Sequence, residues 1–444
     1  MTAATSNADA PFRLPQARLR MIVNATPMLE SQFMKLGKRG DFCDVVIVSG
    51  SFRLDATRWQ LLAQHRPAEA ADAYWDEADP LSSSIKRPGD YVVFKPATDV
   101  YVTGHAHVLS ADPNATAAEW DVGLRIGRGE GSKDVLLNKS LHVTGPRWWA
   151  RSLLGWTLSK PQAAHSVPLR YELAYGGWWR KPDVADADDA LMRYPSNPSG
   201  SGFMAPSLIV DDGTDPRAQH PPRYRKGEPI VGPQIGYVGD TLDRVNDRYR
   251  PAGYGPIARH WEPRVNHAGN YAAKQLAEGA ARGYNTYPED FDERFFQDAP
   301  ADQQLSPHLQ GDEWIDLVGL IPGIPAIRTF LPDFTIRAQL RHEDATIRLT
   351  DMLLDTLHLE TGGGVDGNSA EQAQAPRLHL TWRLTLPHAD RISTVTLYRR
   401  AISDAPLSPA PGFRQVPSVP RDANKILQDI LRDKRAESTR DTKP

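Results

Sequence analysis

The stretch Arg377-Leu-His-Leu-Thr-Trp-Arg-Leu-Thr-Leu386 alternates apolar and polar side chains without a break. Its apolar residues occupy every second position: Leu378, Leu380, Trp382, Leu384 and Leu386. Successive side chains of a β-strand point to opposite faces of the sheet, so this period of two predicts a strand with one apolar face. Residues 392–398 alternate in the same way and predict a second strand close behind it.

The same alternation occurs near the start of the sequence. Over residues 100–108 the small and apolar side chains share one face and the polar and aromatic side chains the other, which predicts a half-buried strand. Residues 41–55 are interpreted as a hairpin that turns at Ser49-Gly50. Residues 122–126 and 135–137 are expected to pair across the glycine-rich turn at 127–131, and residues 168–175 alternate again.

Several short strands separated by turns predict a fold class. We expect a mainly β protein, with an antiparallel β-sandwich-like scaffold, long irregular loops and a few short helices. Residues 20–180 form an N-terminal β-rich domain, residues 181–310 a loop-rich irregular segment packed on the scaffold, and residues 311–405 a C-terminal β-rich part.

The last part of the sequence has a different composition. Residues 406–420 are rich in proline and predict an extended spacer, followed by an amphipathic tail helix within residues 406–444. One helical stripe of this tail is apolar: Ile426, Leu427, Ile430 and Leu431. The stripe either packs on the protein's own scaffold or binds a partner protein.

Composition limits the possible partners and compartments. The 444 residues contain 52 Lys+Arg and 55 Asp+Glu, a formal net charge of -3, so no overall field attracts nucleic acid or an anionic membrane. Cys43 is the only cysteine, which excludes an intramolecular disulfide and suits a reducing compartment. Residues 1–20 are polar and contain Pro11 and Pro15 where a secretory apolar segment would lie. We expect a soluble, cytoplasmic protein that does not insert into membranes.

Three patterns resemble chemical sites without completing one. His105 and His107 share a strand face and could hold a metal, but no third ligand stands at metal spacing, so no metal is predicted. Asp290 and Asp292 could share a proton or hold a sugar, but in a loop of this composition they more often accept local hydrogen bonds. Cys43 has no histidine nearby in sequence. The residues therefore predict no catalytic set, no cofactor and no metal.

Two adjacent tryptophan pairs are more informative. Trp148-Trp149 and Trp178-Trp179 would each send their rings to opposite faces of an extended backbone, so one ring of each pair lies away from the core side. Either the irregular segment covers those rings or they form a protein-binding surface, because tryptophan and arginine are enriched at binding hot spots. The predicted partner contacts are Arg147, Trp149, Trp178 and Trp179.

An ordered series of short motifs runs over residues 24–398. The first motifs are Lys95-Pro96-Ala-Thr98-Asp99-Val100, Gly104-His105-Ala106, Gly145-Pro146-Arg147-Trp148, Pro168-Leu-Arg170-Tyr171-Glu172 and Tyr175-Gly176-Gly177. The later ones are Asn197-Pro198, Gly253-Tyr-Gly255-Pro256-Ile257, Pro288, Ala299-Pro300, Asp302-Gln303, Gly311-Asp-Glu313, Phe330-Leu331-Pro332, Asp355-Thr356-Leu357 and Trp382-Arg383. Further residues in this middle part are expected to organise loops: Arg259, Trp261, Arg264, Asp290, Asp292 and Arg294.

Taken as an ordered series over residues 24–398, these motifs resemble the DUF2169 family. The resemblance implies a function in the type VI secretion system. Members of the family are regarded as non-enzymatic adaptors or chaperones that help load an effector toxin onto the VgrG and PAAR spike proteins. An alternative from a different class is a carbohydrate-binding or carbohydrate-active β-sandwich that uses tryptophan platforms with Asp290 and Asp292.

Overall fold

The structure is a computed structural model of the protein. It describes residues 20–38, 40–129, 134–152, 155–180, 191–203, 229–242, 249–282, 284–362 and 375–402. The predicted tail stripe Ile426, Leu427, Ile430 and Leu431, together with the spacer before it, lies outside the described residues.

The largest sheet has seven strands and contains the strand expected at 377–386. Its order is β2-β3-β26-β25-β7-β20, and β4 pairs with β3. The strands are β2 (Leu29–Leu36), β3 (Phe42–Asp55), β4 (Arg58–Leu61), β7 (Thr98–Thr103), β20 (Gln304–Leu305), β25 (Leu353–Glu360) and β26 (Arg377–Pro387). The apolar face of β26 lies in the main core, where the Trp382 ring stacks on Phe334 with 5.6 Å between centroids.

The polar face of this sheet is also buried. Ser51, His379, His358 and Tyr101 occupy matching positions on β3, β26, β25 and β7, and all four are at most 6% exposed. The expectation of a half-buried strand over 100–108 is therefore wrong. Every residue of β7 is buried, and the strand ends before Gly104, after which β8 (His105–His107) pairs elsewhere. Other segments of the protein lie over the polar face, so hydropathy alone underestimates its burial.

A five-stranded sheet lies beside it, in the order β19-β10-β9-β21-β22. Its strands are β9 (Glu119–Gly127), β10 (Val135–Thr144), β19 (Ile235–Tyr237), β21 (Trp314–Ile321) and β22 (Ile324–Phe330). The predicted pairing across the glycine-rich turn is confirmed, since Val135 pairs with Gly127 and Leu137 with Ile126. β19 forms one edge of this sheet.

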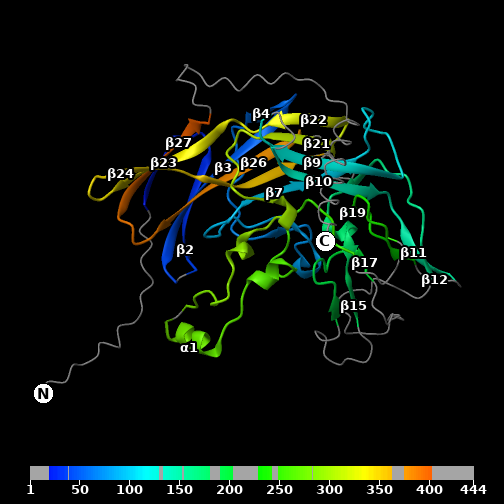
Figure 1. The fold of residues 1–444 in the computed structure, drawn as a ribbon, viewed down its shortest axis with the longest axis horizontal. Coiled ribbons are helices and arrows are strands. Elements are labelled where there is room, and N and C mark those ends of the chain that lie inside the picture. Colours follow the sequence, from blue (N-terminus) through cyan, green and yellow to red (C-terminus); the bar gives the residue numbers. More distant parts are fainter. Residues whose placement is uncertain are drawn as a thin grey trace, which may run out of the picture.

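A four-stranded sheet completes the scaffold, in the order β1-β27-β23-β24. Its strands are β1 (Met21–Asn24), β23 (Phe334–His342), β24 (Ile347–Asp351) and β27 (Ile392–Ala401). One contiguous apolar core contains residues of all three sheets. The prediction of a mainly β, sandwich-like scaffold is confirmed, and Figure 1 shows strands from the early and late parts of the sequence interleaved.

Strand pairing crosses the positions 180 and 310 at which the sequence was divided. Strands from the N-terminal part, β3, β7 and β9, pair with strands from the C-terminal part, β26, β25 and β21. Two other local expectations are wrong. Residues 42–55 form one continuous strand instead of a hairpin, and residues 171–173 form a 3-10 turn instead of strand.

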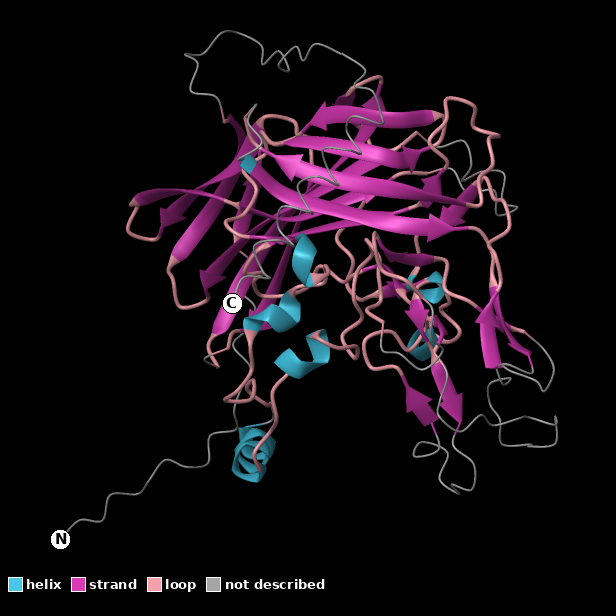
Figure 2. Cartoon of the chain, turned by 45° about the vertical axis from the view of Figure 1, so that its right-hand side comes forward, coloured by secondary structure: helices cyan, strands magenta, loops and turns pink. Residues whose placement is uncertain are grey.

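The short elements lie on one side of the sheets (Figure 2). The helical ones are η1 (Pro80–Ser82), η3 (Tyr171–Leu173), η4 (Arg264–His267), α1 (Ala273–Arg282), η5 (Glu293–Phe296) and η6 (Ala301–Gln303). The small strands are β5 (Ala73–Tyr74), β6 (Ile85–Arg87), β11 (Trp148–Ser152), β12 (Gly155–Leu158), β13 (Ser166–Pro168), β14 (Tyr175–Gly176), β15 (Trp178–Arg180), β16 (Leu191–Arg193), β17 (Ser201–Gly202) and β18 (Ile230–Val231). None of the helices in the described ranges has the length and apolar character needed to cross a membrane.

Candidate functional site

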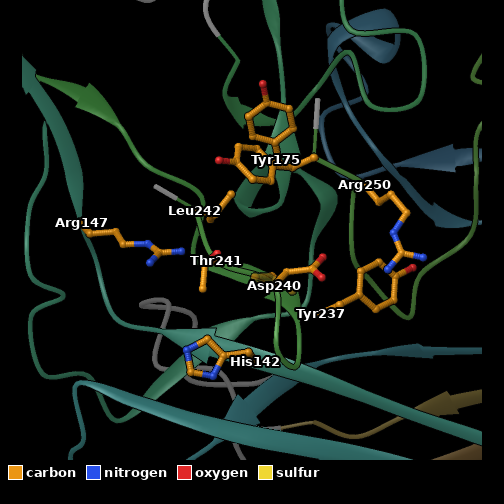
Figure 3. A pocket seen from close by; sticks show the side chains of 11 residues that line it. His142, Arg147, Tyr175, Tyr237, Asp240, Thr241, Leu242 and Arg250 are labelled. Carbon is orange, nitrogen blue, oxygen red and sulfur yellow. The ribbon is translucent and has the colours of Figure 1, made fainter. Parts of the chain in front are cut away.

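A pocket of about 200 Å³ opens beside the edge strand β19. We call it the tyrosine pocket, and its lining is shown in Figure 3. The lining residues are His142, Arg147, Tyr175, Ile235, Gly236, Tyr237, Asp240, Thr241, Leu242, Tyr249 and Arg250. Most of them come from β10, β14, β19 and the residues that follow β19, so the pocket forms where separate segments meet.

One wall of this pocket is a stiff aromatic cluster. The Tyr175 ring packs edge-on against Tyr194 and Tyr249, with centroids 5.2 Å and 5.1 Å apart. The Tyr194 hydroxyl donates a hydrogen bond of 2.7 Å to the Tyr249 carbonyl. Edge-to-face packing of this kind fixes ring positions, so the wall is shaped before any ligand arrives.

Arg147 stands opposite in the connection between β10 and β11. Its Nε donates to the Pro233 carbonyl at 2.6 Å, and its own carbonyl accepts from Gly232 at 2.8 Å. Among the described residues, no acceptor lies at hydrogen-bond distance from its two terminal nitrogens. Burial lowers the pKa of the Arg147 guanidinium, and Glu119 partly opposes this shift. The group is thus held by one edge and directs its other donors into the pocket (Figure 3).

The far wall carries a second guanidinium. Arg250 lies over the Tyr237 ring, 4.6 Å from its centroid, and is exposed to solvent. Burial, followed by the charge of Asp302, raises the pKa of Tyr237 to about 12, so this phenol stays protonated at neutral pH. Asp240 supplies a carboxylate to the same lining. Within the described part of the chain, the arginines and aspartates of the lining are therefore Arg147, Arg250 and Asp240.

A second pocket of about 290 Å³ adjoins the first. We call it the tryptophan pocket, and it is lined by Glu172, Gly176, Gly177, Trp178, Ser199, Gly200, Ser201, Gly202, Phe203, Ile230 and Val231. Tyr175 lines one pocket and Gly176 the other, and consecutive Cα atoms are about 3.8 Å apart. The linings of the two pockets therefore meet at these two residues.

The predicted contact residues divide between surface and core. Arg147 lines the tyrosine pocket, and the half-buried Trp178 lines the tryptophan pocket. Trp149 needs correction as a contact, because it is 2% exposed and packs against Ile230 of β18. Its neighbour Trp148 is the half-buried ring of that pair. Trp179 follows Trp178 in β15, where its backbone pairs with Met192.

Arg264 belongs to a group of charges inside the scaffold. The ammonium of Lys95 lies 2.8 Å from Asp99 and 2.6 Å from Asp298, and Arg264 lies 2.6 Å from the other Asp298 oxygen. We call Lys95, Asp99, Arg264 and Asp298 the buried ion cluster; each is at most 3% exposed. Arg264 also donates to the Phe295 and Ile257 carbonyls. The cluster joins β7 to the irregular segment that packs on it.

The other loop residues have local partners. Trp261 is fully buried and packs edge-on against Tyr171, while Arg259 lies 3.2 Å from Asp72. Asp290 accepts the Asn270 backbone N–H, and Asp292 accepts the backbone and guanidinium N–H groups of Arg294. These bonds occupy both carboxylates in loop structure, which counts against a shared proton or a sugar ligand for the pair.

The remaining candidates form no larger constellation. The rings of His105 and His107 are 6.2 Å apart, and among the described residues no group of three or more metal-ligating side chains comes together. Burial, followed by His105, lowers the pKa of His107 to about 4. Burial, Asp41 and Asp44 raise the pKa of the Cys43 thiol to about 11, which disfavours a thiolate.

A row of three residues has the order of a catalytic triad. The Ser51 hydroxyl lies 2.9 Å from His379 Nδ1, and Glu360 lies 3.2 Å from His379 Nε2. However, Ser51 is 2% exposed and its oxygen accepts the backbone N–H of Arg66. Arg66 in turn pairs with Glu360 at 2.8 Å. This row fastens the segment after β4 onto the sheet and presents no accessible nucleophile.

A comparison with family models matches residues 39–383 to DUF2169, described as an uncharacterized protein conserved in bacteria. The chain belongs to the DUF2169 family. Searches of curated proteins and of solved structures found no match. The DUF2169 region contains both the buried ion cluster and the two pockets, so family motifs serve the fold and also surround an open site.

Sequence reasoning identifies Arg147 and Trp178 but misses most of the tyrosine pocket. Tyr237, Asp240 and Arg250 lie in stretches with no periodic pattern. The pairing of β19 with β10, together with the hydrogen bonds of Arg147 to the segment before β19, brings them to Arg147. The useful signal is Tyr175-Gly176-Gly177, because consecutive glycines beside an aromatic residue indicate a close backbone approach.

Proposed function

We propose that this protein is a non-enzymatic adaptor or chaperone of the type VI secretion system. In the cytoplasm it binds an effector toxin and assists its loading onto the VgrG and PAAR spike proteins. Membership of the DUF2169 family supports this proposal, together with the role that its resemblance implies.

The observation that carries the proposal is the pair of adjoining pockets. Volumes of about 200 and 290 Å³ are below the roughly 300 Å³ at which pockets for whole small molecules begin, and suit single side chains. Their walls include aromatic rings held by packing, which lose little entropy when a partner binds. A surface of this kind suits another polypeptide.

Coexpression with the neighbouring effector and spike genes tests the proposal. Affinity capture on the wild-type protein is expected to retain one or both. Trp178→Ala should weaken capture by about 2 kcal/mol, roughly thirtyfold, with unchanged thermal unfolding. Tyr271→Ala, an exposed aromatic residue before α1, is the matched control and should capture normally. Loss of both partners from the wild-type capture, with effector delivery intact after gene deletion, would overturn the proposal.

A further inference from the structure

We propose that the tyrosine pocket binds a carboxylate of a partner polypeptide, with Arg147 as the specificity-determining residue and Arg250 as the second cation. The inference rests on the proposed adaptor function and names the chemistry of the segment that it grips. The tryptophan pocket next to it takes an apolar side chain of the same segment.

The first argument is that most N–H donors of the Arg147 guanidinium have no acceptor among the described residues. A guanidinium has five N–H donors, and among the described residues one acceptor, the backbone carbonyl of Pro233, bonds to that of Arg147. The two terminal nitrogens are not buried, so an anion that enters the pocket can accept from them without displacing a protein partner. The bond at Nε fixes the plane of the group, so the terminal nitrogens form a fork that can hold both oxygens of a carboxylate.

The second argument is the charge count. Among the described lining residues, two arginines and one aspartate leave one excess positive charge. A carboxylate, with one negative charge, balances it, whereas a phosphate with nearly two charges would leave an excess of negative charge.

The third argument is the arrangement of the surroundings. The consecutive residues Tyr175 and Gly176 line the arginine-containing pocket and the Trp178-containing pocket respectively, so the two pockets lie close together. An extended peptide advances about 3.3 Å per residue and alternates its side chains. A carboxylate and an apolar residue a few positions apart can therefore enter the two pockets together. The carboxylate can belong to an acidic side chain or to a polypeptide C-terminus.

Two libraries of random peptides, one with free C-termini and one with amidated C-termini, test the inference on the purified full-length protein. Wild-type protein is expected to select carboxylates near an apolar residue. Enrichment in both libraries identifies acidic side chains, and enrichment of free C-termini alone identifies a C-terminus. Selection without any preference for a carboxylate would overturn the inference.

Substitutions then test the assigned residues with one selected peptide. Arg147→Gln should weaken its binding about tenfold to a hundredfold, the range for a charge-assisted contact. Arg250→Gln should weaken peptide binding less. It provides the test of the pocket if Arg147→Gln disturbs the contact with Pro233. Arg348→Gln, exposed on the distant strand β24, is the matched control and should bind normally. Unchanged affinity in both pocket variants would overturn the assignment.

The outcomes separate this inference from the adaptor proposal. If the effector and spike proteins are captured but peptide selection ignores carboxylates, the pocket inference fails and the adaptor stands. If peptide selection shows the carboxylate preference but neither protein is captured, the inference about the pocket stands. The proposal that the partners are the effector and spike proteins then fails.

Discussion

The buried ion cluster and the tyrosine pocket use the same types of charged residue in opposite ways. In the cluster, Lys95 and Arg264 face Asp99 and Asp298 at 2.6–2.8 Å, and all four side chains are nearly inaccessible to solvent. In the pocket, Arg147 is half-buried and has one acceptor among the described residues. Two positive and two negative charges cancel in the first region, while the second retains an excess of positive charge.

The difference separates structural from functional charge within one family pattern. Lys95, Asp99 and Arg147 all belong to motifs through which the sequence resembles DUF2169, so motif membership does not distinguish their roles. The roles of these residues are distinguished instead by whether the hydrogen-bonding groups of each charged side chain are already paired within the protein. A fully paired buried charge mainly specifies structure, whereas a fixed cation with open donors is available to a ligand.

The largest expected effect comes from a substitution that breaks the buried ion cluster. Asp298→Ala leaves Lys95 and Arg264 short of a buried counter-charge and should lower the free energy of unfolding by about 3–5 kcal/mol. Asp240→Ala, in the pocket and exposed, should change it by less than about 0.5 kcal/mol. Urea denaturation measures both. A loss below about 1 kcal/mol for Asp298→Ala would contradict the structural role.

If Asp298→Ala does not fold, Gln297→Ala provides the measurement. Gln297 donates to Asp99 at 2.6 Å and accepts the backbone N–H of Ala97 at 2.7 Å. Its loss leaves two buried groups with fewer partners and should cost about 2 kcal/mol.

A second prediction sharpens the comparison within one tryptophan pair. Trp149→Ala empties the small core with Ile230 and should cost about 3 kcal/mol, while Trp148→Ala should cost less than about 1 kcal/mol. Hydrogen exchange of the β11 and β18 amides measures this local stability directly. Equal effects of the two substitutions would show that burial does not separate the rings.

The strongest alternation in the sequence predicts a scaffold strand correctly. Elsewhere, the strands that pair with a segment determine whether it stays extended or turns. Residues 377–386 form β26 as expected, because their period of two matches burial on the core face. Ser49-Gly50 has the composition of a turn, yet β2 and β26 pair on both sides of β3 and keep it extended. Gly50 allows a close approach instead: a Cβ there would lie 2.7 Å from the Met28 sulfur.

The site is predictable only where residues of one segment carry it. Arg147 and Trp178 can be identified from local sequence, whereas Arg250 reaches the pocket through contacts between residues about a hundred positions apart. Which ring of Trp148-Trp149 is buried depends on the pairing of β11 with β18, a choice that alternation alone does not make.

A third prediction concerns the free energy of unfolding at acidic pH. It tests the scaffold and involves no residue of the tyrosine pocket. Burial, followed by His105, lowers the pKa of His107 from 6.5 to about 4, so between these pH values the unfolded state binds more protons than the folded one. Stability is full above pH 6.5 and falls as the pH drops toward 4. At pH 5 the loss due to His107 should amount to about 2 kcal/mol.

The comparison of pH dependence isolates this histidine. Burial also lowers the pKa of His358 and His379, so other buried histidines add to the acid loss. His107→Gln should therefore reduce the slope of unfolding free energy against pH without abolishing it. Urea denaturation at pH 7 and pH 5 gives the slopes, and identical slopes in the two proteins would exclude a contribution from His107.

The smallest expected effect on stability belongs to Gly236→Ala, a substitution in the lining of the tyrosine pocket. A Cβ built at Gly236 meets nothing within 4 Å, so Gly236→Ala should change the free energy of unfolding by less than about 0.5 kcal/mol. At Gly104, by contrast, the backbone φ is +144° and a Cβ would lie 2.1 Å from the Thr361 hydroxyl, so Gly104→Ala should destabilise strongly. Because Gly236 lines the tyrosine pocket, its added methyl group should weaken peptide binding while leaving the unfolding transition unchanged. Unaltered peptide affinity in Gly236→Ala would place the bound segment away from β19, whereas a selective loss would place it against that edge strand.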